Sequence, residues 1–263
     1  MMTRGARIAV LLGVALAAGA AIAVFPPIPQ DPAYHRFADV RPAGSVANGW
    51  NVLSNLAFLV VGLWGLAHVV RARSGPGTAF IDARERWPYA LFFAGVALTG
   101  IGSAYYHWAP DTPRLFWDRL PMTVGFMALL AAIVAERVGV TAGLVVLGPL
   151  VAAGVGSIIY WRAGELRGAG DLRLYALVQF VPALLILLML WLCPPRYTGG
   201  GFLLGVLGIY GAAKVFEALD GPIFSLGSLL SGHTLKHLTV ALAAWWVVKA
   251  LDTRRAMTTE ETT

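Results

Sequence analysis

The sequence has little charge and almost no cysteine. Charged residues make up 13% of its 263 residues, and 58% are hydrophobic. A soluble domain typically carries about 25% charge, so this chain cannot cover the surface of a water-soluble globule. The same balance excludes a disordered chain, which needs low hydrophobicity and high charge. The single cysteine, Cys193, excludes an intrachain disulfide and leaves the redox compartment open.

The chain also lacks the alternating ten-residue pattern of a membrane β-barrel, and it shows no internal repeat. It contains instead eight apolar segments of helical length, at about 7–25, 50–70, 88–106, 119–136, 141–161, 174–193, 202–219 and 233–251. Each is long enough to span a bilayer as a helix. We therefore predict an all-α integral membrane protein, a seven-helix transmembrane bundle over 50–251 plus one extra N-terminal hydrophobic helix.

The chain outside this bundle divides into three parts. Residues 1–25 are expected to be a signal anchor or a cleaved signal peptide, and their apolar length favours the anchor. The proline-rich, polar residues 26–49 are predicted to form an extracytoplasmic loop. Residues 252–263 are predicted to be a disordered cytoplasmic tail.

The basic residues predict the orientation of the chain. With the N-terminus inside, eleven of them lie in cytoplasmic loops or ends and seven on the other side, a moderate positive-inside bias. The formal charge of +6 then reflects loops that face anionic lipid rather than nucleic acid, and nothing indicates a protein partner. The abundance of Arg, Ala and Gly suggests a bacterial genome. We expect a multi-pass protein of the bacterial inner membrane.

Polar side chains gather at the outer ends of three segments. Ser103 and His107 are spaced i, i+4 and share one helix face, as do His233 and His237. Asp118 begins the segment after His107, and a return loop of about ten residues can bring the two together. The loop charges place all five near the same, periplasmic face. Ionisable groups in spanning segments are costly and usually functional.

Three neutral imidazoles from two helices form a plausible set of zinc ligands. A catalytic zinc keeps three protein ligands and one position for water, whose pKa it lowers to about 7. Asp118 is then a general base or a partner of an imidazole, and Ser103 a donor to a developing oxyanion. The alternative is structural, because an H-x3-H pair also arises by chance and a membrane-embedded His can simply bond a backbone carbonyl.

Other polar positions have a structural and a functional interpretation. Asn51 and Asn55 must hydrogen-bond inside the bundle, as links between helices or as support for the site. Lys214 and Glu217 are expected to pair with each other, and Asp220 lies where it can border the site.

The remaining polar and aromatic residues are expected to be interfacial. His35 and His68 are predicted to be solvated or interfacial, and Glu165 and Asp171 to belong to a salt-bridge network in an outer loop. The interfacial aromatic belt is predicted to contain Tyr105, Tyr106, Trp108, Trp117 and Trp161.

The chain resembles the alkaline ceramidases, within a superfamily of seven-span membrane hydrolases that includes the progestin/adipoQ receptors and the Per1-type proteins. The resemblance covers about 39–250. It rests on the combination of NVLSNLAFLVVGLWGL at 51–66, GIGSAYYHWAP at 100–110, WDRLPM at 117–122, GDLRLYALVQFVP at 170–182 and SGHTLKHL at 231–238.

The resemblance implies a zinc ion on His107, His233 and His237, a catalytic Asp118 and a serine near the metal, Ser103. It implies hydrolysis of the amide of ceramide to a sphingoid base and a fatty acid. It also implies that the acyl chains of this lipid substrate, drawn from the bilayer, lie in a cavity among the helices.

The chain departs from the family in two ways. Eukaryotic alkaline ceramidases look calcium-regulated through acidic residues before their first core span. Here Asp39 remains, but Asn48 stands where a Glu is expected and the acidic run is missing, which argues against a calcium site. Many bacteria lack sphingolipids, so another N-acyl lipid is an alternative substrate.

Two rival functions remain open. A seven-span receptor or sensor would use the same ligands for a structural zinc, which takes four protein ligands rather than three. A transporter would need a polar path to the cytoplasmic side, and the inner halves of the segments are almost wholly apolar.

Overall fold

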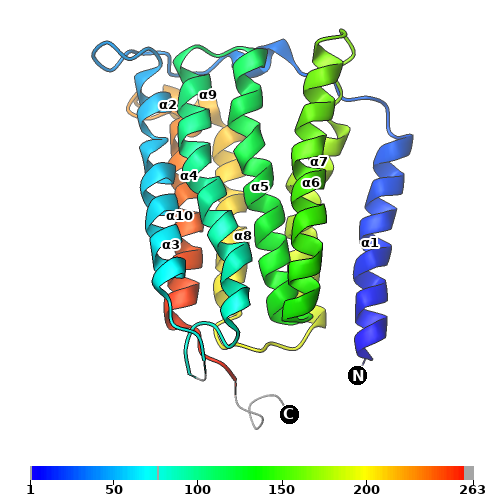
Figure 1. Cartoon of the computed structure of the whole chain (residues 1–263). Coiled ribbons are helices and arrows are strands. Elements are labelled where there is room, and N and C mark those ends of the chain that lie inside the picture. Colours follow the sequence, from blue (N-terminus) through cyan, green and yellow to red (C-terminus); the bar gives the residue numbers. More distant parts are fainter. Residues whose placement is uncertain (1, 76, 258–263) are drawn as a thin grey trace.

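The computed structural model describes residues 2–75 and 77–257, and within them helices form all the extended regular structure. No β-strand occurs in this part of the chain, only three isolated bridges. Figure 1 shows the long helices side by side: α1 (Arg4–Val24), α3 (Leu56–Arg71), α4 (Arg86–Trp108), α5 (Thr112–Arg137), α6 (Val140–Glu165), α7 (Arg173–Leu192), α8 (Gly201–Ala218) and α10 (Gly232–Thr253). Four short elements join them: η1 (Pro32–His35), α2 (Gly49–Leu53), η2 (Ala83–Glu85) and α9 (Asp220–Ser225).

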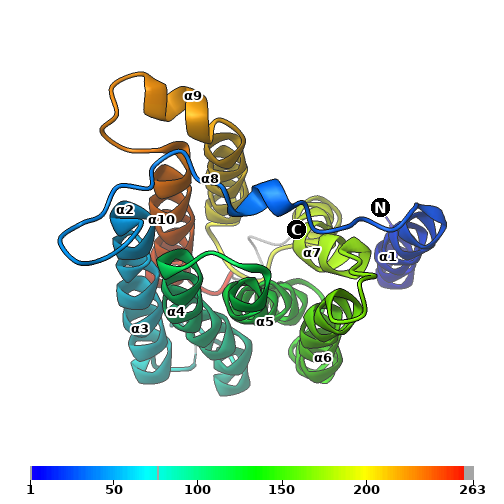
Figure 2. The ribbon, with the colours of Figure 1, turned by 90° about the horizontal axis from the view of Figure 1, so that it is seen from above.

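Seven of the described helices are long and apolar enough to cross a membrane, the first of them α1. The eighth long helix, α10, has 22 residues but is less apolar, because its first turns carry His233, Lys236 and His237. It nevertheless packs within the bundle, against α8 and α3 (Figure 2). The predicted all-α membrane bundle with one extra N-terminal helix is therefore confirmed.

The helices extend beyond the apolar segments that predicted them. Helix α5 begins at Thr112 rather than at 119, because the Asp111 side chain caps it by accepting a hydrogen bond from the Arg114 backbone N–H at 2.7 Å. Only a short turn therefore separates α4 from α5. Hydropathy marks the part of a helix suited to lipid, whereas the cap decides where the helix starts.

Helix α1 stands at the margin of the bundle. It packs beside α7, and none of its residues is buried (Figure 2). From its end, residues 26–48, here called the strap, cross one end of the bundle to reach α2. The backbone of Ile28 bonds the Leu172 N–H at 2.8 Å, and the Ala38 N–H donates to Asp220 at 2.9 Å. The strap is thus tied to the connections before α7 and α10.

Two glycines allow the helices to approach closely at this same end. A Cβ on Gly102 would lie 2.0 Å from the Trp117 carbonyl oxygen, so only glycine brings α4 this near to α5. A Cβ on Gly232 would lie 2.2 Å from the Phe216 carbonyl oxygen, where α10 starts against α8. Each glycine precedes a residue predicted to act in the site.

The opposite end of the bundle holds buried ion pairs. Arg254 and Glu136 approach to 2.8 Å, and Arg254 also donates to the Tyr89 hydroxyl at 3.2 Å. The expectation of almost wholly apolar inner halves is therefore wrong at this end. The predicted tail also starts too early, because α10 continues to Thr253 and the ion pair buries Arg254. Residues 258–263 of that tail lie outside the described residues.

The aromatic residues assigned to the membrane interface divide into two groups. Tyr105, Trp108 and Trp117 are exposed, as a belt requires. Tyr106 and Trp161 are fully buried in a small core with Leu115. Their placement in the belt was wrong because sequence alone does not tell which side of a helix faces the bundle.

Candidate metal centre

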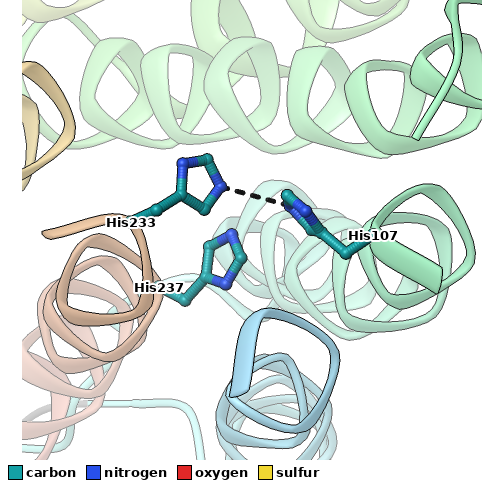
Figure 3. A group of neighbouring side chains, drawn as sticks. All are labelled: His107, His233 and His237. Atoms are coloured by element: carbon teal, nitrogen blue, oxygen red, sulfur yellow. Dashed lines mark hydrogen bonds between the residues drawn. The ribbon is translucent and has the colours of Figure 1, made fainter. Parts of the chain in front are cut away.

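Three histidines meet at the strap end of the bundle. His107 comes from the last turn of α4, and His233 and His237 come from the first turns of α10 (Figure 3). Each pair of rings has its centroids 4.8 Å apart, so the rings form an equilateral triangle. One nitrogen from each ring lies within 4.8 Å of the others, and all three residues are buried. Among the described residues, no other group of three or more His, Cys, Asp or Glu side chains is arranged to hold a metal ion.

The start of α10 is fixed by hydrogen bonds that aim its histidines. The Ser231 side chain caps the helix by accepting from the Thr234 N–H at 3.2 Å. The Asp220 carboxylate accepts from the His233 N–H at 2.8 Å. On the facing helix, the amide of Asn48 donates to the His107 carbonyl at 2.9 Å. Both ends that carry ligands are therefore held by side chains from neighbouring segments.

The hydrogen bonds of Ser54 determine which nitrogen of His237 faces the site. The Ser54 hydroxyl donates to the Asn51 carbonyl at 3.3 Å and lies 2.8 Å from His237 Nδ1. A hydroxyl has one proton to give, so it accepts the proton of Nδ1. The lone pair of His237 is then on Nε2, the nitrogen available to a metal.

The geometry of the other two rings fits a metal as well. Nε2 of His107 and Nε2 of His233 are 3.2 Å apart. Two nitrogens bound to one tetrahedral zinc at about 2.0–2.1 Å would be about 3.3 Å apart. Nδ1 of His107 is buried without a hydrogen-bond partner. Neutral imidazoles that converge in this way can hold a metal ion, and the donor set suits zinc among several transition metals.

Ser103 and Asp118 lie together beside the histidines. Both are buried, they come from the adjoining helices α4 and α5, and the Ser103 hydroxyl is a hydrogen-bond partner of the Asp118 carboxylate. Both line a cavity that His237 also lines. Asp118 is not part of the three-nitrogen group, so the structure places it beside the candidate ligands rather than among them.

The cavity is large and mostly apolar. Its volume is about 460 Å³, within the usual range for a small-molecule site. The polar wall near the histidines contains Ser103, Asp118, Arg119, Glu217, Lys236 and His237. The apolar wall continues along α5, α7 and α8 past Phe126, Leu129, Ile186, Val206 and Leu207. One end of the space thus holds polar chemistry and the rest can hold a chain of methylenes.

Lys236 is a polar residue of the site that the sequence reasoning missed. Its ammonium lies 3.0 Å from Nε2 of His233 and 3.2 Å from the Glu217 carboxylate. Glu217 also pairs with Lys214, as predicted, so one carboxylate is shared by two lysines. A lysine one position before a candidate ligand in an apolar segment was a visible signal.

Asn51 of α2 and Asn55, which precedes α3, support the site rather than line the metal group. The Asn51 amide donates to the Asp39 carbonyl at 2.9 Å, and its oxygen accepts from the Thr234 hydroxyl at 3.2 Å. The Asn55 amide donates to the Asn51 carbonyl at 2.7 Å. Asp220, which bonds the strap and the start of α10, supports the site in the same way.

The two side chains considered for calcium binding already have hydrogen-bond partners within the protein. The Arg41 side chain bonds both oxygens of Asp39, at 2.8 and 2.7 Å, and these bonds hold the pKa of the carboxyl below its ordinary range. Asn48 donates its amide to a backbone carbonyl and sits at a φ of 48°. Neither side chain is arranged as a free oxygen ligand.

The strap covers the histidines. The ring of Phe37 lies 4.7 Å from that of His107 and 4.5 Å from that of His233, centroid to centroid. His35 is only partly exposed, and its two nitrogens lie 2.9 Å from the Tyr106 hydroxyl and 3.1 Å from the Thr112 hydroxyl. His35 is therefore an anchor of the strap rather than a freely solvated side chain.

The remaining histidine and outer acids lie apart from the three histidines. His68 pairs with Asp252 at 3.3 Å near the opposite end of the bundle. Asp171 pairs with Arg173 at 2.9 Å, whereas Glu165 accepts from the Trp161 indole at 3.1 Å. The predicted outer salt-bridge network therefore includes Asp171 but not Glu165.

Comparison with family models and with curated proteins identified no relative of the chain. No family model matches the chain, and no curated protein matches it significantly.

Proposed function

We propose that the chain is a zinc-dependent membrane hydrolase that cleaves the amide bond of ceramide or a related N-acyl lipid. The observation that carries the proposal is the buried triangle of His107, His233 and His237 beside Ser103 and Asp118. Three protein ligands are typical of a catalytic zinc, which keeps a position for water or substrate. The resemblance to the alkaline ceramidases supports the same assignment of these five residues.

A zinc ion bound by the three imidazoles would supply Lewis acidity, which polarises an amide carbonyl and acidifies a water molecule. Asp118 is the group that takes the proton from this water and gives it to the leaving amine. Ser103 donates its hydroxyl proton to the oxygen that becomes negative. The contact between the two side chains couples these roles, because a protonated Asp118 can donate to Ser103 and release the serine hydroxyl for the substrate.

The shape of the cavity supports a lipid substrate. An acyl chain fits the apolar wall between α5, α7 and α8, and the amide then lies at the polar wall. The strap, with Phe37 against the ligand rings, covers the aqueous side of the three histidines. We place the protein in a bacterial inner membrane with this end toward the periplasm.

The alternative is a receptor or sensor with a structural zinc and no turnover. A structural site is closed by four protein ligands, whereas the three histidines of the described residues form a group without a fourth His, Cys, Asp or Glu.

A transporter gains some support from the charged residues at the end of the bundle opposite the strap. Those residues, however, pair with one another in a region whose cavity is only about 20 Å³.

The test combines metal analysis of the purified full chain with fatty-acid release from a panel of N-acyl lipids. We expect about one zinc per chain and turnover that is abolished by His233→Ala and by Asp118→Asn. His68→Ala and Asp252→Asn are matched controls far from the site, and both should keep activity and zinc. Full activity and full zinc in His233→Ala would refute the proposal, and zinc without turnover on any lipid would favour the sensor.

A further inference from the structure

One cation in the cavity wall has no acidic partner within hydrogen-bonding distance in the part of the chain that the structure describes. Arg119 is 4% exposed and lines the cavity on α5. Among the described residues it forms no ion pair and no hydrogen bond, and its Nη1 is buried without a partner. Burying a charge without a partner is strongly unfavourable. The structure therefore contains a buried guanidinium in the cavity wall that no acceptor of the described residues hydrogen-bonds.

Aromatic rings hold this guanidinium in place. Its Cζ lies 5.2 Å from the ring centroid of Tyr34, 4.8 Å from that of Trp161 and 4.9 Å from that of Tyr175. Cation–π contacts stabilise the charge and fix the orientation of the group. They supply no acceptor in the guanidinium plane, where the five N–H bonds point. An anion with planar oxygens matches that fork.

The other charged side chains of the cavity wall have partners within the protein. Asp31 accepts from the Ala33 N–H at 2.8 Å. Lys214 and Lys236 both bond Glu217. Asp118 has Ser103 as its hydrogen-bond partner; it interacts electrostatically with Arg119, but no hydrogen bond or close ion pair joins the two side chains. None of these carboxylates hydrogen-bonds Arg119, and a ligand with one negative charge would supply the missing acceptor.

The place of Arg119 in the cavity indicates which part of a lipid meets it. Three polar residues of the strap, Gln30, Asp31 and Tyr34, line the cavity, and the Tyr34 ring packs against the Arg119 guanidinium. The side-chain oxygen of Gln30 is also buried without a partner. The apolar wall extends away from these groups toward Ile186. The acyl chain of a bound lipid therefore lies along the apolar wall, and its head lies under the strap.

We infer that the ligand of this cavity is an acidic lipid, an N-acyl compound whose head carries a carboxylate that binds Arg119. The inference rests on the proposed function in one respect, namely that the lipid bound in the cavity is the substrate. A neutral ceramide head offers no charge to the guanidinium, so the acidic lipid is the better complement. A carboxylate is preferred to a phosphate monoester because it carries one charge and is planar.

The test measures binding with probes that cannot be hydrolysed. Hexadecyloxyacetate carries the carboxylate, and 2-(hexadecyloxy)ethanol is its neutral match. The full chain in neutral-detergent micelles should bind the carboxylate at least about tenfold more tightly, the usual effect of one hydrogen-bonded charge pair. Arg119→Gln should lose most of this preference. Arg114→Gln, on the same helix but outside the cavity, should keep it.

The arms of the experiment separate this inference from the metal chemistry. The preference should be the same in zinc-loaded and chelator-treated protein, so its failure differs from a failure to bind zinc or to hydrolyse lipids. Equal binding of both probes by the wild-type chain would overturn the inference even if Arg119→Gln did not fold. A preference that survives Arg119→Gln, or that vanishes with the metal, would also overturn it. Tighter, Arg119-dependent binding of 2-(hexadecyloxy)ethyl phosphate would overturn the choice of a carboxylate.

Discussion

Replacing Ser54 by alanine tests whether the protein orients a metal ligand in advance. The serine hydroxyl lies 2.8 Å from Nδ1 of His237 and is buried with it. In Ser54→Ala, the proton on Nδ1 loses its nearest acceptor and keeps, within the described chain, only the Asn51 backbone carbonyl, so the ring is held less firmly. Partners of this kind on a ligating imidazole contribute about 10–100-fold to metal affinity, equivalent to about 1.4–2.8 kcal/mol.

The energy of the lost hydrogen bond has a similar magnitude. Leaving a buried donor without any partner costs about 1–3 kcal/mol, which is the upper limit for a donor that keeps the Asn51 carbonyl as a weaker partner. The metal-free protein can avoid this cost by rotating the ring of His237, whereas a metal-bound ring cannot. The loss should therefore appear in binding more than in folding. We expect the zinc affinity of Ser54→Ala to fall about 10–100-fold and the melting temperature of the metal-free protein to change little.

The assay is competition for zinc between the purified full chain and a chromogenic chelator. Ser157→Ala is the matched control, because Ser157 is a buried serine on α6 that bonds only the Gly154 carbonyl of its own helix, at 2.7 Å. The control should bind zinc as the wild type does. A zinc affinity of Ser54→Ala within about twofold of the wild type, against the 10–100-fold expected, would refute the assigned tautomer and the role of Ser54.

Three further predictions concern other contacts. Lys236→Met should raise zinc affinity about tenfold, since the ammonium competes for the Nε2 lone pair of His233; weaker zinc binding in the same chelator competition would contradict this. Arg254→Met should lower the free energy of unfolding in detergent by about 1–3 kcal/mol, because the buried Glu136 carboxylate loses its closest charged partner and keeps, among the described residues, only the 3.5 Å contact with Arg137 and the Tyr89 hydroxyl; a change below about 0.5 kcal/mol would show the pair to be unimportant. Burial and a nearby positive charge lower the pKa of His35 below its ordinary 6.5, so the unfolded chain takes up the proton first and stability falls as the pH drops through 6.5. His35→Gln should show a smaller fall in melting temperature between about pH 7.5 and about pH 5.5, and an equal fall would mean that His35 does not contribute.

The helices and the metal group could be predicted because they depend on local or periodic signals. Long apolar runs predict spanning helices whatever they pack against. The i, i+4 spacing places His233 and His237 on one face, and a short return from α4 constrains α5. The loop charges then suggested that His107 lies at the same end, and the structure brings the three rings together.

Features that depend on which side of a helix faces inward could not be predicted. Arg119 is the first residue of the predicted segment 119–136, where a basic side chain is expected to face water, yet it is buried among aromatic rings. Trp161, one of those rings, was placed at the membrane interface for the same reason. Hydropathy scores residues singly, whereas the burial of Arg119 comes from three rings on separate segments.

The one native cysteine has a practical consequence for membrane sidedness. Cys193 is 6% exposed and packs among apolar side chains, so it offers little to a water-soluble maleimide. A cysteine introduced at Ser228, an exposed position at the strap end, would then be the single reactive thiol of the chain. Arg84→Cys would provide the same handle at the other end of the bundle, where that side chain is also exposed. Labelling of Ser228→Cys, but not of Arg84→Cys, by an impermeant reagent on intact spheroplasts would show that the strap faces the periplasm, and the reverse pattern would invert the topology.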